Sequence, residues 1–374
     1  MPLQNLQYQK TFRNREEMLN HLQNFKLEIK PCVGIWYLSG SGSRFHEAYS
    51  DAIPIVRCIE TVYELAKYGV KAVEGHIGTE INRENLHLFK ALQKETGICI
   101  SQIGPHTFYD REFEFGTLSN PIGKIRDRAT QKLIDVLQLV RDADADACGL
   151  WPGIDGYTYP YGHMFYQMWE NFECALVEAM DEVPGVMVRI EPKPYEPIPN
   201  NIYRTTSDAL LLARDVEARL KNPVNRQLLA QGHCLVGMQP EIGHIRMGYE
   251  DTPYVFSRIC REGRMSHPHF NSQPLGNYDQ DLNTGVVEWD QAEAGLFALK
   301  MAGFKEYIGI DINPVRMTAK KAVINNTRIL TIMNERIENL PYERILDCYY
   351  SPDENRGELE MILAENMRPF YREK

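Results

Sequence analysis

Carboxylate and imidazole side chains recur in four short segments of the 374-residue chain, each at or just after an apolar run. Carboxylate oxygens are hard ligands that suit Mg²⁺ or Mn²⁺, and imidazole nitrogens shift the preference toward Mn²⁺, Co²⁺ or Zn²⁺. One segment carries two aspartates at alternate positions, a pair that can embrace a single cation. The pattern indicates a site for divalent cations with seven candidate ligands: Glu191, Glu241, His244, His269, Asp279, Asp281 and Asp311.

Each segment taken alone also has a simpler structural interpretation. Glu191 could form a plain ion pair with Lys193, because a buried carboxylate needs a compensating charge. The two-residue gap between Glu241 and His244 also occurs by chance. Asp279 and Asp281 could form a solvated acidic turn, and Asp311 could cap a following helix. Convergence favours the metal interpretation, since five carboxylates brought to one place without cations would repel one another strongly.

The elements that must position these residues alternate in type along the chain. From about residue 31, short β-rich apolar runs are followed by longer segments of helical periodicity. Eight such runs predict a (β/α)8 TIM barrel, with an open doubly wound sheet as the alternative. The predicted strands are CVGIWY, GVKAVE, GICISQI, ACGLW, VMVRIE, CLVGMQ, MSHPHF and YIGID, the first beginning at Cys32 and the last ending at Asp311.

A barrel would gather the candidate residues, because its active sites lie at the C-terminal ends of the strands and in the loops that follow. The candidate ligands occur at such places, as do His76 after the second predicted strand and Trp151 at the end of the fourth. We expect residues 1–312 to form the barrel with a short N-terminal lead-in, and residues 313–374 to form a closing helix and a C-terminal arm. The arm would contact another subunit in a homodimer or homotetramer.

The composition limits the classes of partner. The formal charge is −10, so a basic surface for nucleic acid or anionic lipid is not expected. The N-terminal segment lacks the apolar core of a signal peptide, and no apolar run approaches the roughly 18 residues of a membrane span. We therefore expect a cytoplasmic protein that acts on a small polar substrate. The eight scattered cysteines are expected to be reduced thiols in the core.

From about Cys32 to Asp311, five segments resemble those of xylose isomerase in order and spacing: WPGIDGY, RIEPKPYEP, QPEIGH, NYDQDL and IDINPVR. The resemblance implies two divalent cations, with Mn²⁺, Co²⁺ and Mg²⁺ as candidates and Zn²⁺ as a further one. It also implies that Glu241 bridges them. The first site would consist of Glu191, Glu241, His269 and Asp311, and the second of Glu241, His244, Asp279 and Asp281.

The same resemblance assigns residues to a sugar substrate. His76 would open the sugar ring, and Lys193 would hold a substrate oxygen and stabilise developing negative charge. These two residues form the predicted catalytic set together with Glu241 and Asp281. The predicted substrate-binding residues are Trp36, Trp151, Lys193, Phe45 and Asn271, with the tryptophans as apolar walls and Phe45 projecting into a neighbouring subunit's site.

Several positions depart from the xylose isomerase pattern. His269 stands where xylose isomerase has Asp and the related rhamnose isomerases have His. Thr79 replaces the Asp that would orient His76, and Asp155 replaces a Glu. The resemblance implies an aldose–ketose isomerase whose sugar differs. The alternatives are a sugar epimerase or a C-glycoside-cleaving subunit with a small partner chain on the same barrel, and a non-catalytic sugar-binding protein.

Overall fold

The computed structural model of the protein describes residues 8, 11–40, 49–314 and 316–366. One predicted substrate-binding residue, Phe45, lies outside these ranges. The predicted cation ligands and the other predicted substrate-binding residues lie within them.

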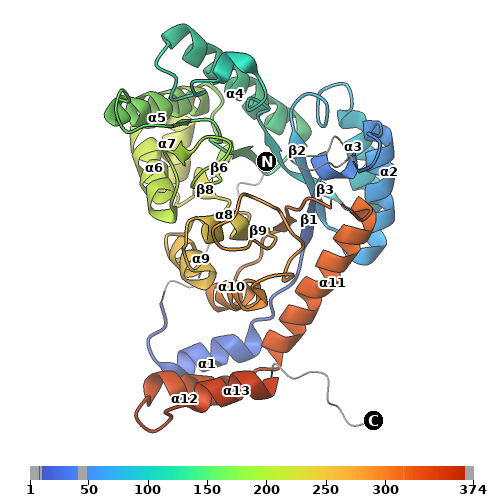
Figure 1. The fold of residues 1–374 in the computed structure, drawn as a ribbon, viewed down its shortest axis with the longest axis vertical. Helices are drawn as coiled ribbons and strands as arrows, with labels where there is room; N and C mark the ends of the chain where they lie inside the picture. The colour runs from blue at the N-terminus through green and yellow to red at the C-terminus, as the bar shows by residue number, and fades with distance from the viewer. Residues whose placement is uncertain (1–7, 9–10, 41–48, 315, 367–374) are drawn as a thin grey trace.

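Eight short parallel strands form the centre of the structure (Figure 1). They follow one another in the order β8-β6-β4-β3-β2-β1-β10-β9. Two further parallel bridges, Met238 with Met265 and Glu241 with His269, bring the outer edges of this sheet together. The sheet therefore curls into the predicted (β/α)8 barrel and not into an open doubly wound sheet. The strands are β1 (Pro31–Gly34), β2 (Ala72–His76), β3 (Cys99–Gly104), β4 (Ala147–Leu150), β6 (Met187–Ile190), β8 (Val236–Met238), β9 (His269–Phe270) and β10 (Ile308–Ile310).

The first strand is shorter than predicted because the chain turns back at its end. β1 stops at Gly34, and Trp36–Leu38 form a 3₁₀ helix, η1, so the prediction of a strand through Tyr37 is wrong. A Cβ atom at Gly34 would come within 2.5 Å of the Trp36 indole, which explains the glycine. The Tyr37 hydroxyl donates to the Ile310 carbonyl at 2.9 Å and accepts from the Gly34 N–H at 3.1 Å, which ties this turn to β10.

The seventh strand is also shorter than the predicted MSHPHF, since β9 contains only His269 and Phe270. Pro268 precedes them and has no N–H to donate to a neighbouring strand, so pairing is interrupted before the last two residues. Gly309 on β10 leaves room for the imidazole that β9 delivers. A Cβ atom at Gly309 would lie 2.3 Å from the His269 ring.

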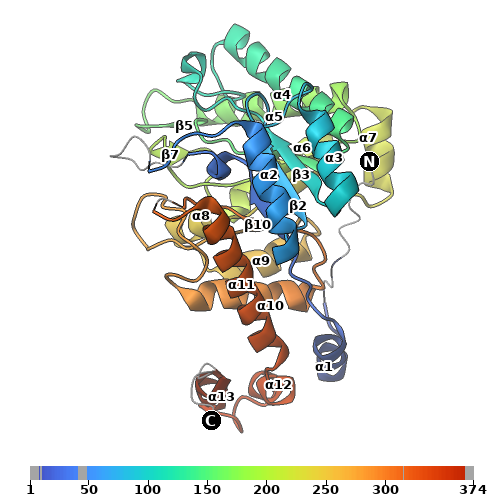
Figure 2. The ribbon, with the colours of Figure 1, turned by 90° about the vertical axis from the view of Figure 1, so that its right-hand side faces the viewer.

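Helices cover the outside of the barrel (Figure 2). They pack on a large buried hydrophobic core. Local sequence fixes where some helices begin. At the start of α6 (Thr206–Arg219), Thr205 and Asp208 form a capping box, in which each side chain accepts a hydrogen bond from the other residue's N–H. A two-stranded pair, β5 (Gly156–Tyr157) with β7 (Asn200–Asn201), lies outside the barrel sheet. The helices are α1 (Arg15–Asn24), α2 (Ile55–Leu65), α3 (Leu86–Thr96), α4 (Gly123–Ala143), α5 (Phe165–Glu182), α6 (Thr206–Arg219), α7 (Pro223–Ala230), α8 (Ile242–Met247), α9 (Thr252–Arg261), α10 (Trp289–Ala302), α11 (Ala319–Glu338), α12 (Tyr342–Tyr350) and α13 (Glu358–Asn366), with short 3₁₀ helices η2 (Ala66–Tyr68) and η3 (Arg111–Phe113).

The last helices extend away from the barrel and meet the first one. α11 runs along the barrel, and α12 lies beyond its end, where it contacts both α1 and α13 (Figures 1 and 2). Leu22 of α1 packs in a small buried cluster with Tyr342 and Leu346 of α12, and Arg15 Nη2 lies 2.7 Å from Asp347 Oδ1. α11 corresponds to the predicted closing helix and α12 and α13 to the arm, whose contact with another subunit stays a prediction. Within the described ranges, no helix is long and apolar enough to cross a membrane.

Candidate metal centre

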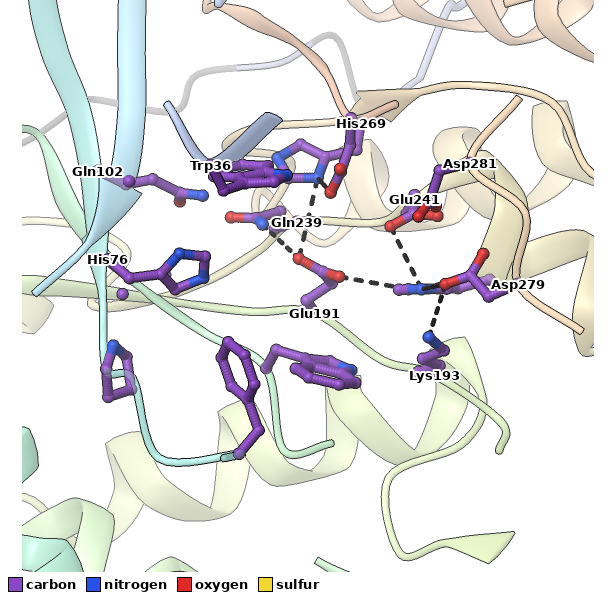
Figure 3. Close-up of a pocket in the computed structure, with 18 residues that line it drawn as sticks. Trp36, His76, Gln102, Glu191, Lys193, Gln239, Glu241, His269, Asp279 and Asp281 are labelled. Carbon is purple, nitrogen blue, oxygen red and sulfur yellow. Dashed lines mark hydrogen bonds and ion pairs between the residues drawn. The ribbon is translucent and has the colours of Figure 1, made fainter. Parts of the chain in front are cut away.

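A pocket of about 270 Å³ opens at the carboxyl ends of the barrel strands. Acidic side chains gather on one side of it, and His76 and aromatic rings lie on the other (Figure 3). The structure therefore brings together residues that are scattered over most of the sequence. The predicted site residues that line the pocket are Trp36, His76, Trp151, Glu191, Lys193, Glu241, His244, His269, Asp279, Asp281 and Asp311.

One group of four ligand-type side chains corresponds to the predicted first cation site. Glu191 follows β6, Glu241 precedes α8, His269 lies on β9 and Asp311 follows β10. One ligand atom from each lies within 4.8 Å of the others. His269 Nδ1 is 3.0 Å from Asp311 Oδ2 and 3.8 Å from Glu191 Oε2. Three carboxylates and one imidazole thus lie within reach of a single cation.

A second group shares a member with the first. Glu241, His244 and Asp279 each offer a ligand atom within 4.8 Å of the others. His244 Nε2 lies 3.3 Å from Glu241 Oε2 and 3.2 Å from Asp279 Oδ2. Asp281, predicted for the second site, lines the same pocket beside this group, where its Oδ1 accepts a hydrogen bond from Asn271 at 3.3 Å. Glu241 therefore belongs to both groups.

Asn271, predicted to bind substrate, is buried and already engaged with the acids. Its Nδ2 donates to Glu241 Oε1 at 2.7 Å, and its Oδ1 accepts from the Gly243 N–H at 2.8 Å. These bonds orient the shared carboxylate. Asp281 has a left-handed backbone (φ 45°), a conformation that Asp and Asn adopt more readily than most residues.

Burial and mutual repulsion oppose the negative charge of this cluster. Burial, together with the charges of Asp279 and Asp311, raises the pKa of Glu241 well above its ordinary value, and burial and Asp279 do the same for the pKa of Asp281. Asp279, although buried, has its pKa held far below the usual range by Lys193, whose Nζ lies 2.6 Å from Asp279 Oδ2. Carboxylates crowded in this way are stabilised by bound cations, so the donor set fits divalent metals.

Aromatic rings form the opposite wall of the pocket. The ring centroids of Trp36 and His76 are 5.3 Å apart, those of His76 and Phe108 are 5.4 Å apart, and those of Phe108 and Trp151 are 5.2 Å apart. Lys193 Nζ lies 5.1 Å from the centroid of the Trp151 ring. The wall predicted from two tryptophans is thus continuous, and Phe108 completes it.

His76 has an acidic partner, Glu80, although Thr79 stands where the xylose isomerase pattern has the orienting Asp. Glu80 Oε2 accepts from the His76 backbone N–H at 2.7 Å and lies 3.1 Å from His76 Nδ1. Although burial opposes the charged form, this carboxylate raises the pKa of His76 above its ordinary value. Glu80 therefore takes the orienting role that Thr79 cannot, and it leaves His76 Nε2 for the pocket.

For the reaction on a cyclic sugar that the resemblance to xylose isomerase implies, Glu80→Gln is expected to lower kcat/KM by about 10- to 100-fold, because the amide keeps a hydrogen bond but loses the charge that supports the imidazolium. Bound metal should not change, since Glu80 belongs to neither ligand group. Steady-state kinetics and metal analysis check both points. Glu84→Gln, an exposed change on the same loop, is the matched control, and an unaltered kcat/KM for Glu80→Gln would refute the role.

A buried acid that the sequence analysis did not single out lies behind the first group. Glu74, on β2, accepts through Oε2 from Gln102 Nε2 at 2.7 Å and from His267 Nε2 at 3.0 Å. The same oxygen lies 3.2 Å from His269 Nε2. Despite burial, the two histidines hold the pKa of Glu74 well below its usual range. Cys32 lies close enough to form a third ligand group with Glu74 and His267, but these three residues do not line the pocket.

Asp155, which stands where the xylose isomerase pattern has Glu, has a structural role in this chain. It is fully buried, and its Oδ1 accepts from the N–H groups of Thr117 and Ser119 at 2.8 and 2.9 Å and from the Ser119 hydroxyl at 2.6 Å. The Thr117 hydroxyl donates to the other carboxylate oxygen. Asp155 thereby joins the loop after β3 to the loop after β4.

Comparison with known proteins agrees with this architecture. The family described as xylose isomerase-like TIM barrel matches residues 62–325. Xylose isomerase of Thermus thermophilus is 22% identical over 345 residues, which cover 87% of this chain and 85% of that enzyme. The fold is shared with a solved D-tagatose 3-epimerase-like protein, with a TM-score of 0.59 and 16% identity, over 83% of this chain and 100% of the other. It is also shared with the solved IOLI protein with a binding zinc atom, with a TM-score of 0.59 and 13% identity, over 83% of this chain and 99% of the other. The chain therefore belongs to the xylose isomerase-like TIM barrel family.

Proposed function

We propose that this protein is a divalent-metal-dependent sugar isomerase that interconverts an aldose and a ketose. The observation that carries the proposal is the position of Glu241, whose carboxylate belongs to both groups of ligand-type side chains. A carboxylate shared in this way suits two cations held a short distance apart. The similarity to a xylose isomerase over most of both chains supports the same class of reaction.

The ligand groups assign residues to each cation. Bound cations supply Lewis-acid polarisation of the carbonyl and hydroxyl oxygens of the sugar. Carboxylates mixed with imidazole favour Mn²⁺ or Co²⁺, with Mg²⁺ and Zn²⁺ as further candidates. The first cation would be held by Glu191, Glu241, His269 and Asp311, and the second by Glu241, His244 and Asp279 with Asp281 beside them.

The remaining side chains of the pocket would bind and orient the sugar. The Trp36 and Trp151 rings pack against its C–H face and exclude water. His76, oriented by Glu80, transfers the proton that opens the ring. Lys193 stabilises negative charge that develops on the substrate oxygen. A hydride then moves from C2 to C1, and the proton of the C2 hydroxyl passes to the C1 oxygen, which converts the aldose into the ketose without gain or loss of atoms.

A one-cation epimerase is the second candidate, and one contact favours it. Lys193 Nζ lies 2.6 Å from Asp279 Oδ2, so a side-chain ammonium already compensates part of the second group. A protein of this kind would bind metal through the first group alone. The solved D-tagatose 3-epimerase-like structure shows that the fold is also found in a protein of that description.

The test is a panel of aldoses deuterated at C2, ketoses deuterated at C3 and unlabelled glycosides, assayed with Mn²⁺, Co²⁺ or Mg²⁺ added to protein stripped by a chelator. An isomerase with a hydride shift converts the labelled aldose into a ketose that retains the deuterium at C1. An epimerase returns a sugar of the same carbonyl type, in which the deuterium at the inverted carbon is exchanged for solvent hydrogen. Turnover that is equally fast in the stripped protein would contradict metal dependence.

Metal removal also has a thermal readout that does not depend on finding the sugar. A ligand that binds the folded state at 100 times its Kd stabilises that state by about 2.7 kcal/mol. Chelation should therefore lower the melting temperature, and addition of Mn²⁺ or Co²⁺ should restore it. A melting temperature that is the same with and without cation would speak against a bound metal.

A further inference from the structure

The first ligand group has a buried support on the side away from the pocket. His269 Nδ1 faces the group, 3.0 Å from Asp311 Oδ2, whereas His269 Nε2 lies 3.2 Å from Glu74 Oε2. The two nitrogens of an imidazole point in divergent directions, so a carboxylate on one fixes which of them carries the hydrogen. With its hydrogen held on Nε2 by Glu74, His269 presents the Nδ1 lone pair to a cation in the pocket.

Several donors bind the same carboxylate oxygen of Glu74. Gln102 Nε2 and His267 Nε2 donate to the same Oε2 at 2.7 and 3.0 Å. The Gln102 amide oxygen accepts in turn from the guanidinium of Arg189, which is fully buried. Any rotation of the Glu74 carboxylate would break several hydrogen bonds that water cannot replace, because Glu74 and His267 are 0% exposed.

Glycines in the neighbouring strands leave space for the side chains of this network. A Cβ atom at Gly309 would lie 2.3 Å from the His269 ring and 3.1 Å from His267 Nε2. A Cβ atom at Gly149 would lie 2.8 Å from the Gln102 amide carbon. Glycines on β10 and β4 therefore provide the room in which these side chains reach Glu74 in the barrel interior.

We propose that Glu74 is a positioning residue that fixes His269 as an Nδ1 ligand of the first cation and strengthens the binding of that cation. Glu74 acts through His269 and does not touch the substrate. Partners of this kind fix ring orientation and raise ligand basicity, and their loss costs about 10- to 100-fold in metal affinity. The inference rests on the proposed first cation site.

Glu74→Gln keeps the size of the side chain but removes the negative charge that holds the hydrogen on Nε2. Calorimetric titration with Co²⁺ should show about 10- to 100-fold weaker binding at the first site. The visible absorption bands of the bound Co²⁺ should also shift, because the donor strength of the imidazole changes. A merely structural role would lower occupancy without moving these bands.

Cys32→Ala is the matched control, because Cys32 is fully buried on β1 next to the same network. Its Co²⁺ affinity and absorption bands should equal those of the unaltered protein. Co²⁺ bands in Glu74→Gln that match those of Cys32→Ala would overturn the inference, whether or not the affinity changes. Unaltered protein that binds no Co²⁺ at all would instead defeat the proposed function.

A measurement on the unaltered protein covers the case in which Glu74→Gln does not fold. Histidine labelled with ¹⁵N can be observed by NMR after loading with Zn²⁺, with the His269 signals assigned by their loss in His269→Asn. The expected pattern is a proton on Nε2 and a metal-bound Nδ1. A metal-bound Nε2 would overturn the inference.

Discussion

Glu241→Gln is expected to remove both cations and to abolish turnover. Glu241 contributes a ligand atom to both groups, and its replacement by a neutral amide leaves the paired cations with less compensating charge at short range. Loss of Lewis-acid assistance costs several kcal/mol of transition-state stabilisation, so kcat should fall by at least about 10³-fold. Metal analysis after dialysis and steady-state kinetics on the active sugar check the two effects together.

Glu173→Gln is the matched control for this change. Glu173 is also a buried glutamate, but it lies on α5, where it pairs with Arg219 at 3.0 Å. Its replacement should alter stability and leave two cations per chain. A Glu241→Gln protein that still holds two cations per chain would show that Glu241 is not the shared ligand.

Asp279→Asn is expected to spare the first cation and to lose the second. Asp279 belongs only to the group with Glu241 and His244, and its charge also holds Lys193 in place. Substrate should still bind through the first cation, so kcat should fall by about 10²- to 10³-fold with a smaller change in KM. The measurement is one cation per chain by metal analysis, combined with the separate changes in kcat and KM.

Asp110→Asn is the matched control, because Asp110 forms a similar pair with Lys132 at 2.9 Å but belongs to neither ligand group. Asp281→Asn is an informative companion, since asparagine tolerates the left-handed backbone at that position. It too should keep the first cation and lose most of kcat. Near-native kcat in both Asp279→Asn and Asp281→Asn would make the one-cation epimerase the better interpretation.

Most of the residues that line the pocket could be predicted, because a barrel places the carboxyl ends of all its strands at one rim. Glu191, His269 and Asp311 each lie at or next to the end of an apolar run, and parallel strands bring such ends to one rim. The strand ends themselves were less certain. Trp36 reads as part of an apolar strand, and only its packing over Gly34 explains why the strand stops before it.

Other residues of the site were not predicted, because the sequence around each of them does not indicate its partners in the folded protein. Glu74 ends the predicted strand GVKAVE, but the sequence around it does not indicate its partners, which come from β3 and β9. Glu80 lies one position beyond the residue that the sequence comparison indicated. Phe108 lines the pocket from a stretch of chain with no distinguishing pattern. Gln239 begins the segment QPEIGH, yet its contact with Glu191, to which Gln239 Nε2 donates at 2.5 Å, could not be predicted from that segment.

The cluster that joins α1 to α12 bears on the order in which the chain acquires its structure during synthesis. Leu22 emerges from the ribosome about 320 residues before its partners Tyr342 and Leu346. The apolar side of α1 is therefore uncovered while nearly the whole barrel is being made. A chain whose synthesis stops before α12 has this side of α1 open to other molecules. The completed arm therefore protects against aggregation as well as forming part of the fold.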